Sequence, residues 1–322
     1  MFLNHSTDAF GDNGGAQRRE SRIGEDGAMR VFVTGAGGQV GRALQSTLPA
    51  EVEFIGLSSS DLDISDDAAV AAQAWAGGRM GKADVVVNCA AYTRVDDAES
   101  DESAATAVNA TGPVNLATVT AATGARLVHL STDYVFDGPA APASPDRSTP
   151  YEPGDTAGEP PSVYGRTKLA GERGVRAADP AATIVRTAWV YTGGRDDSDF
   201  VATMRRLGAE RDRLTVVDDQ LGSPTYAVDL ARGLWELIEN NTGRGAILHA
   251  TNAGETTWCG LAKAVFAATG LDPDRVSACS TADYPRPAPR PAYSVLSTRS
   301  WADAGLTPLR DWRDALSAAL VR

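Results

Sequence analysis

Tyr164 and Lys168 are the pair of side chains in this sequence with the clearest capacity for proton transfer. If Tyr164 begins a helix, the spacing of four places both side chains on the same helical face, one turn apart. An ammonium beside a phenol lowers the pKa of the phenol and eases proton exchange with a ligand. Thr132 follows a predicted strand and adds a hydroxyl. Together the three residues predict a proton-transfer site for a carbonyl or an alcohol.

A glycine-rich turn near the start of the chain predicts a dinucleotide site. Residues 30–34 form an apolar, β-branched run typical of a buried strand, and residues 42–48 have a helical pattern. Between them, glycines 35, 38 and 41 have the spacing at which a pyrophosphate approaches the backbone and the N-terminus of a helix. We therefore expect cofactor contacts at Gly35, Gly38, Gln39 and Val40.

The region after the second predicted strand, residues 52–57, bears on the choice of cofactor. Three serines, residues 58–60, stand where an acid would bind the ribose 2′-hydroxyl and repel a 2′-phosphate. The absence of that acid favours NADPH, and NADH stays possible because no arginine is present to bind the phosphate. Asp61 and Leu62 come next. They either flank the adenine or, in the case of Asp61, form the N-cap of a helix.

Strand and helix patterns alternate along the first two thirds of the chain, which predicts an α/β fold with a Rossmann-like, doubly wound parallel sheet. Further strands are expected at residues 83–91, 127–130 and 183–191. Small residues end the first of these, so Ala90, Ala91 and Tyr92 are expected beside the cofactor. The strand at 127–130 delivers Thr132 to the carboxyl edge of the sheet, where ligands bind in such folds.

The domain organisation follows from composition and pattern. Residues 1–28 are rich in Gly, Asp, Ser and Arg and lack the apolar stretch of a signal peptide, which predicts a disordered extension. We expect residues 29–185 to form the dinucleotide-binding domain, with about 226–250 returning to it. Residues 186–322 are expected to form mainly a smaller, mixed substrate-binding domain. The proline-rich stretch 138–161 predicts a loop that covers the site.

The net charge of −12 argues against binding to nucleic acid or to an anionic membrane surface, since both require a basic patch. The three cysteines have no CxxC spacing and suggest neither disulfides nor a metal site. No apolar run approaches the roughly 18 residues that span a bilayer. A cytoplasmic enzyme is the simplest expectation.

Seven segments in register resemble the dTDP-4-dehydrorhamnose reductases, a family of extended short-chain dehydrogenases/reductases. The similarity extends from Met29 to about residue 320. It rests on the segments TGAGGQVG (34–41), NCAAYT (88–93), VD with AE (95–99), STDYVFDG (131–138), VYGRTKLAGE (163–172), RTAWVY (186–191) and DQLGSPT (219–225). The resemblance implies reduction of the 4-keto group of a dTDP-linked 6-deoxyhexulose, giving dTDP-L-rhamnose.

The resemblance also implies roles for individual residues. Tyr164 would donate a proton to the developing alkoxide, Lys168 would hold the nicotinamide ribose and lower the pKa of Tyr164, and Thr132 would bind the substrate oxygen. The implied substrate contacts are Thr93, Val95, Asp133, Tyr134, Trp189 and, for the diphosphate, Arg290. Related dehydratases carry Asp-Glu after the active-site threonine. This chain has Asp133-Tyr134, which favours reduction over elimination of water.

Three alternatives remain open at this stage. Some relatives dimerise around a magnesium held by glutamates at positions that are Ala43 and Val228 here, so we expect no metal and favour a monomer. The substrate could be another nucleotide-linked 4-keto-6-deoxy sugar. The same fold also serves as the non-catalytic regulatory subunit of a methionine adenosyltransferase, although the presence of Thr132, Tyr164 and Lys168 argues against that role.

Overall fold

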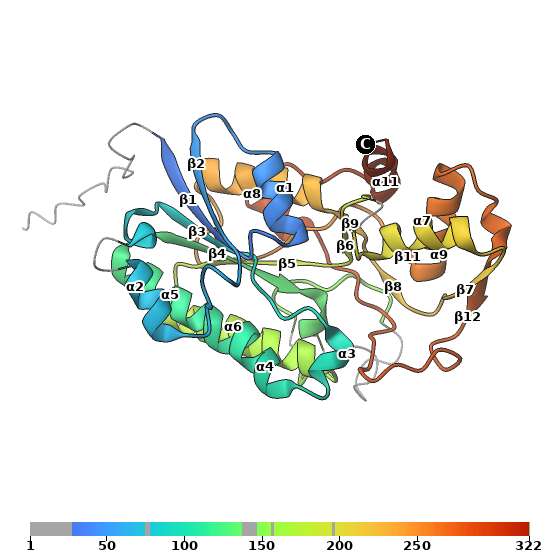
Figure 1. Cartoon of the computed structure of the whole chain (residues 1–322), viewed down its shortest axis with the longest axis horizontal. Coiled ribbons are helices and arrows are strands. Elements are labelled where there is room, and N and C mark those ends of the chain that lie inside the picture. Colours follow the sequence, from blue (N-terminus) through green and yellow to red (C-terminus); the bar gives the residue numbers. More distant parts are fainter. Residues whose placement is uncertain (1–27, 75–77, 137–146, 156–157, 195–196, 322) are drawn as a thin grey trace, which may run out of the picture.

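The structure is a computed structural model that describes residues 28–74, 78–136, 147–155, 158–194 and 197–321 (Figure 1). The predicted N-terminal extension therefore lies, apart from Ala28, outside the described residues. Part of the predicted covering loop also lies outside them, at residues 138–146 and 156–157.

Six parallel strands form the central sheet, in the spatial order β10-β5-β4-β3-β1-β2. Their bounds are β1 (Met29–Thr34), β2 (Val52–Leu57), β3 (Val85–Asn88), β4 (Arg126–Thr132), β5 (Thr183–Thr187) and β10 (Ile247–His249). β3 and β5 are buried along their whole length, as expected for a parallel sheet with helices on both faces. The predicted doubly wound parallel sheet is confirmed.

Helices cover both faces of this sheet (Figure 1). On one face lie α1 (Gln39–Ser46) and α8 (Ala227–Glu239). The other face carries α2 (Asp67–Ala74), α5 (Gly112–Thr123) and α6 (Val163–Ala178), with the short helices η1 (Arg79–Lys82), α3 (Val95–Ala98), α4 (Glu102–Thr106), the π-helical turn η2 (Ala107–Thr111) and η3 (Asp133–Val135) nearby. Two apolar clusters fill the spaces between sheet and helices.

The remaining elements gather beyond the carboxyl ends of the strands, at the right of Figure 1. They are β6 (Val190–Tyr191), α7 (Phe200–Glu210), β7 (Leu214–Val217), β8 (Leu221–Gly222), β9 (Thr225–Tyr226), β11 (Thr256–Thr257), α9 (Trp258–Ala268), η4 (Pro273–Arg275), β12 (Val276–Cys279) and α11 (Trp312–Leu320). The short helix α10 (Arg299–Asp303) instead packs beside the central sheet, against β10 and α8. The short strands pair as β6 with β9, β7 with β12 and β8 with β11. The division of the chain near residue 185 stays a prediction.

Two predicted strands are wrong in their extent. The strand expected at 83–91 is β3, which covers only Val85–Asn88. Residues 183–191 do not form a single strand, because β5 ends at Thr187 and Trp189 adopts a left-handed backbone conformation with φ of 48°. This conformation is costly for a bulky side chain and is incompatible with a continuous strand. The chain turns there, and β6 pairs with β9 instead of continuing in the central sheet.

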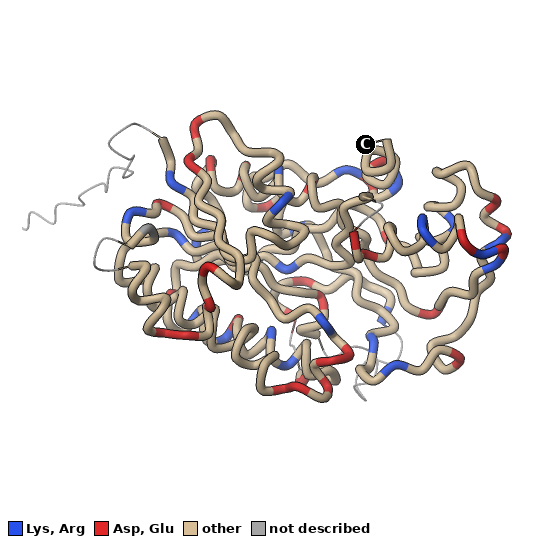
Figure 2. The backbone as a smooth tube through the Cα atoms, viewed as in Figure 1, with Lys and Arg blue, Asp and Glu red and all other residues tan. Residues whose placement is uncertain are grey.

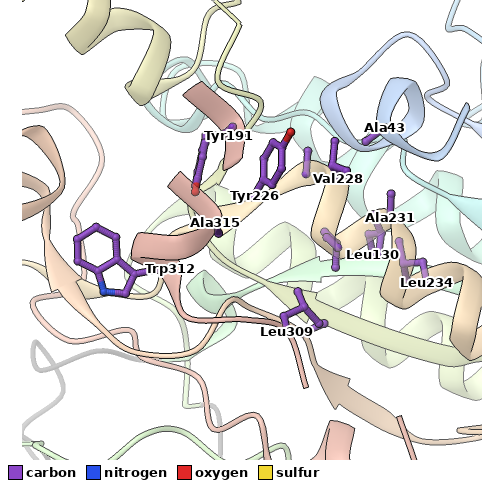
Figure 3. Packing of buried hydrophobic residues seen from close by; sticks show 14 of the residues in the cluster. Ala43, Leu130, Tyr191, Tyr226, Val228, Ala231, Leu234, Leu309, Trp312 and Ala315 are labelled. Carbon is purple, nitrogen blue, oxygen red and sulfur yellow. The ribbon is translucent and has the colours of Figure 1, made fainter. Parts of the chain in front are cut away.

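The positions at which some relatives carry metal ligands belong to the core in this chain. Ala43 of α1 and Val228 of α8 are buried in the larger apolar cluster, together with Leu130 and Leu234 (Figure 3). Their side chains have no oxygen with which to bind a hard cation. These two positions therefore stabilise the packing of α1 on α8, and the expected monomer remains a prediction.

Candidate active site

The glycine turn connects β1 to α1 at the carboxyl edge of the sheet. Gly35 has a φ of +67°, and a Cβ there would lie 2.6 Å from the backbone nitrogen of Ala90. A Cβ on Gly41 would lie 2.5 Å from Cα of Ala36, so this glycine lets α1 pack against the turn. Gly38 precedes α1 and provides no side-chain cap. The first amides of α1, from Gln39 onward, are thus available to a phosphate, which fits a dinucleotide.

We expect Gly35→Ala to lower both stability and cofactor affinity. The left-handed conformation alone costs about 1–2 kcal/mol for a residue with a Cβ, and the contact with Ala90 adds to this cost. Thermal melting with and without NADPH measures both effects. The matched control is Gly37→Ala in the same turn, because a Cβ at Gly37 would meet no atom within 4 Å. Equal melting temperatures for the two variants would contradict the assignment.

Thr132, Tyr164 and Lys168 come together where β4 meets the first turns of α6. Ser162 caps this helix, since its Oγ accepts a hydrogen bond from the Gly165 amide. Lys168 donates from Nζ to the backbone oxygen of Leu130 on β4, at 2.7 Å. The Thr132 hydroxyl donates to Oδ1 of Asp133, at 2.9 Å, and its interaction with the Tyr164 phenol lowers the pKa of that phenol. All three side chains are at least nine-tenths buried. The predicted trio therefore forms one site.

Burial dominates the electrostatics of the trio. Burial raises the pKa of Tyr164 to about 12, against a lowering contribution from its interaction with Thr132. Burial lowers the pKa of Lys168 to about 8, while the charge of Glu172 raises it. The lowering contribution to the Tyr164 pKa comes here from Thr132, and the expected lowering of this pKa by Lys168 stays a prediction. The phenol remains protonated at neutral pH and is available as a proton donor.

Glycines on α6 let this helix approach its neighbours closely. A Cβ on Gly165 would lie 2.3 Å from the backbone oxygen of Tyr134, and one on Gly171 would lie 2.1 Å from that of Asn109. Asn109 lies in the π-helical turn, where its side chain accepts a hydrogen bond from the Tyr92 amide and donates to the Thr167 hydroxyl. These contacts hold the segment after β3 against the helix that carries Tyr164.

Aromatic and apolar side chains surround Tyr164. Its ring meets that of Tyr134 edge to face, with centroids 5.4 Å apart. Tyr92 and Val95 pack in the same small cluster. Asp133, next to Thr132, is buried, and burial raises the pKa of its carboxyl group to about 6. The predicted cofactor contact Tyr92 and the predicted substrate contacts Val95, Asp133 and Tyr134 thus lie around the trio.

A cleft of about 380 Å³ contains further predicted contacts. Gln39, Thr93 and Trp189 line it, so cofactor and substrate candidates share one cavity. The Trp189 ring stacks on Trp258 at a centroid distance of 3.5 Å, and Phe200 packs against the same Trp258 ring. Trp258 and Phe200 also line this cleft, and the sequence analysis did not identify them as residues of the site. Nothing in their spacing links them to Trp189, which is 69 positions before Trp258.

Arg290, the predicted diphosphate contact, forms an ion pair with a carboxylate of the protein. It pairs with Asp96 of α3 at 2.8 Å, and Arg286 binds the same carboxylate. Burial alone would raise the pKa of Asp96, but the hydrogen bonds from Arg290 and Arg286 bring it to about 2. Figure 2 shows further acidic positions along α3 and α4. A diphosphate contact at Arg290 would therefore compete with Asp96, and it remains a prediction.

The predicted adenine contacts lie at the end of β2, away from the trio in sequence and in the sheet. Asp61 is exposed and accepts hydrogen bonds from the Ser58 amide and hydroxyl, whereas Leu62 is buried in the second apolar cluster. The adenine contacts are not tested by this arrangement. The alternative that Asp61 forms the N-cap of a helix is wrong, because α2 begins only at Asp67. His129 and His249 are buried, and burial lowers the pKa of each.

The parallel sheet, the glycine turn at its carboxyl edge and the tyrosine-lysine helix define an extended short-chain dehydrogenase/reductase. Within that class, the chain belongs to the RmlD substrate binding domain family, which matches residues 29–322.

Three similar proteins support this assignment. A dTDP-4-dehydrorhamnose reductase of Mycobacterium tuberculosis (strain ATCC 25618 / H37Rv) is 54% identical over 293 residues, covering 91% of this chain and 92% of the relative. A probable dTDP-4,6-dihydroxy-2-methyloxan-3-one 4-ketoreductase of Streptomyces antibioticus is 47% identical over 298 residues, covering 90% and 94%. The crystal structure of dTDP-4-dehydrorhamnose reductase from Bacillus anthracis in complex with NADP has a TM-score of 0.83 at 34% identity, covering 91% and 99%.

Proposed function

We propose that this chain is an NADPH-dependent dTDP-4-dehydrorhamnose reductase, the enzyme of the last step of dTDP-L-rhamnose synthesis. The observation that carries the proposal is the buried trio of Thr132, Tyr164 and Lys168 beside the glycine turn, in a chain 54% identical to a reductase of that name. Bound NADPH supplies the hydride. The side chains of the protein supply orientation, a water-poor environment and the proton.

The proton comes from Tyr164. Negative charge develops on the 4-oxygen of the sugar as its carbon is reduced, and a donor aimed at that oxygen stabilises the transition state. With a pKa raised to about 12 by burial, the phenol is fully protonated at neutral pH yet still far more acidic than an alcohol. Thr132 binds the same oxygen, and Lys168 provides a positive charge that holds the nicotinamide ribose. The reductase thus consumes one proton for each turnover.

The substrate contacts follow from the arrangement around this trio. Tyr134 and Val95 adjoin Tyr164, and Thr93 and Trp189 line the cleft, which supports their assignment to the sugar nucleotide. Asp133 and Arg290 complete the predicted set. The cofactor set combines the glycine turn, the segment after β2 and the end of β3. Its members are Gly35, Gly38, Gln39, Val40, Asp61, Leu62, Ala90, Ala91 and Tyr92.

A spectrophotometric assay tests the proposal directly. Purified protein with dTDP-4-dehydro-L-rhamnose and NADPH is expected to show substrate-dependent loss of absorbance at the nicotinamide band, with NADH measured in parallel. NMR of the product is expected to identify dTDP-L-rhamnose. Turnover with only a different dTDP-linked keto sugar would indicate that the chain is a reductase of another substrate, as the name of the Streptomyces antibioticus relative suggests for that protein. Absence of turnover with co-purification of a synthetase would favour a regulatory subunit.

The setting of the enzyme is part of the same proposal. In the described ranges, no helix has the length and apolarity required to cross a membrane. The dTDP-sugar is the expected partner, and the chain is proposed to act as a cytoplasmic monomer. Size-exclusion chromatography with light scattering, with and without magnesium, measures the oligomeric state.

A further inference from the structure

Two tryptophans among the described residues line the cleft of about 380 Å³, and their rings stack on each other. The ring centroids of Trp189 and Trp258 lie 3.5 Å apart, and the ring planes differ by only 9°. Both side chains are half-buried, whereas Trp235, Trp301 and Trp312 lie in the core. The stacked pair therefore forms part of the wall of the cleft.

The backbone at Trp189 holds an unfavourable conformation. Its φ of 48° lies in the left-handed region, which is costly for a bulky residue and persists only where the surroundings hold it. The Thr225 amide donates to the backbone oxygen of Trp189 at 3.2 Å and fixes the main chain there. This bond does not fix the ring, because the side chain still rotates about χ1 and χ2. Side-chain contacts must set the plane of the indole.

One small two-stranded sheet supplies two of those contacts. A Cβ on Gly222 of β8 would lie 2.5 Å from Cε2 of Trp189, so the indole lies directly against the main chain of this strand. β8 pairs with β11, and Trp258 follows β11 as the first residue of α9. The pairing of β8 with β11 thus brings both Gly222 and the Trp258 ring to the indole of Trp189.

Trp258 is itself held from several sides. Its Nε1 donates to Oε1 of Gln220 at 3.1 Å, and Nε2 of Gln220 donates to the Thr281 hydroxyl at 2.9 Å. Phe200 packs against the Trp258 ring with centroids 4.7 Å apart. Thr257 caps the helix at this point, since its hydroxyl oxygen accepts from the Gly260 amide. A ring fixed in this way can determine the plane of the ring stacked on it.

We propose that Trp258 is a positioning residue of the reductase, whose indole fixes the plane of the Trp189 ring so that Trp189 presents a preformed apolar surface to the sugar of the substrate. This inference rests on the proposed function and deepens it, because it adds a determinant of sugar binding from α9. A preformed surface requires less ordering when the ligand binds, so the effect falls on substrate affinity.

Steady-state kinetics of Trp258→Leu test this role. The KM for dTDP-4-dehydro-L-rhamnose is expected to rise about 2–10-fold, the range to which the stacking of one aromatic pair corresponds. The kcat and the KM for NADPH are expected to stay at their wild-type values, because a contact made equally with bound substrate and transition state changes KM alone. Trp258→Phe keeps an aromatic face and is expected to recover most of the wild-type KM.

A double-mutant cycle with Trp189→Leu separates an indirect role from a direct contact. If Trp258 acts through Trp189, adding Trp258→Leu to Trp189→Leu causes no further rise in KM. If the two rises multiply, Trp258 binds the sugar nucleotide itself, and the proposal is overturned.

Fluorine NMR measures the order of the Trp189 ring without any turnover. Labelling with 5-fluorotryptophan marks the six tryptophans of the chain, and the resonance that disappears in Trp189→Leu belongs to Trp189. This resonance is expected to be narrow in the wild type and broadened or split in Trp258→Leu. A resonance that stays equally narrow in Trp258→Leu shows that the ring is fixed without Trp258 and overturns the proposal.

The control for a general loss of stability is Trp312→Phe. Trp312 on α11 is 2% exposed, lies in the core (Figure 3) and does not line the cleft. This variant is expected to lower the melting temperature, to keep the wild-type KM and to leave the Trp189 resonance narrow. A rise in KM equal to that of Trp258→Leu would mean that destabilisation alone explains the effect, against the proposal. A wild-type protein without turnover contradicts the proposed function, and the fluorine spectra still decide whether Trp258 holds the ring.

Discussion

Replacing Tyr164 with phenylalanine is expected to lower kcat by a factor of about 10²–10⁴, the usual contribution of a positioned general acid. In the proposed mechanism the phenol is the proton donor, and it keeps its proton at neutral pH because burial raises its pKa to about 12. The substitution removes one oxygen and keeps the ring that packs against Tyr134. Stopped-flow measurement of NADPH oxidation gives the rate of the chemical step.

The same change on the surface is the matched control. Tyr284 is 53% exposed, and Tyr284→Phe is expected to keep the wild-type rate. NADPH affinity, measured by fluorescence, is expected to stay close to the wild-type value in Tyr164→Phe because Lys168 and the glycine turn are intact. A loss of less than about tenfold in kcat would show that another group protonates the sugar.

Replacing Glu172 with glutamine is expected to destabilise the fold by about 3–5 kcal/mol. Glu172 on α6 and Arg186 on β5 form a two-point ion pair at 2.7 and 2.9 Å, with side chains only 3% and 4% exposed. Breaking one side of a buried pair leaves an uncompensated charge in the interior. Differential scanning fluorimetry measures the resulting fall in melting temperature, which we expect to be several degrees or more.

The control for this substitution is an exposed pair of the same type. Arg206 and Glu210 face each other one turn apart on α7, with side chains more than half exposed. Glu210→Gln is expected to change stability by less than about 0.5 kcal/mol. If Glu172→Gln is no more destabilising than this control, the ion pair does not anchor α6. Because Glu172 also raises the pKa of Lys168, its loss is expected to lower that pKa, so that Lys168 loses its charge at a lower pH than in the wild type.

Much of the fold could be predicted because its sequence patterns are local. The strands at 30–34, 52–57 and 127–130 are confirmed by β1, β2 and β4, and the glycine turn has the conformation that its spacing indicates. The strand predicted at 183–191 was too long, because an apolar run does not reveal that Trp189 leaves the extended conformation. That turn depends on how the aromatic ring packs against Trp258 and Gly222.

The sequence by itself determined the family, the glycine turn and the placing of Tyr164 and Lys168 on one helical face, because these depend on residue type and short spacing. Only the tertiary structure decided which groups surround them. Arg290 forms an ion pair with Asp96, which is distant in the chain. The burial that raises the pKa of Tyr164 also depends on segments that lie far from it in the sequence. Desolvation and hydrogen-bond direction are properties of packed elements, and no local spacing encodes them.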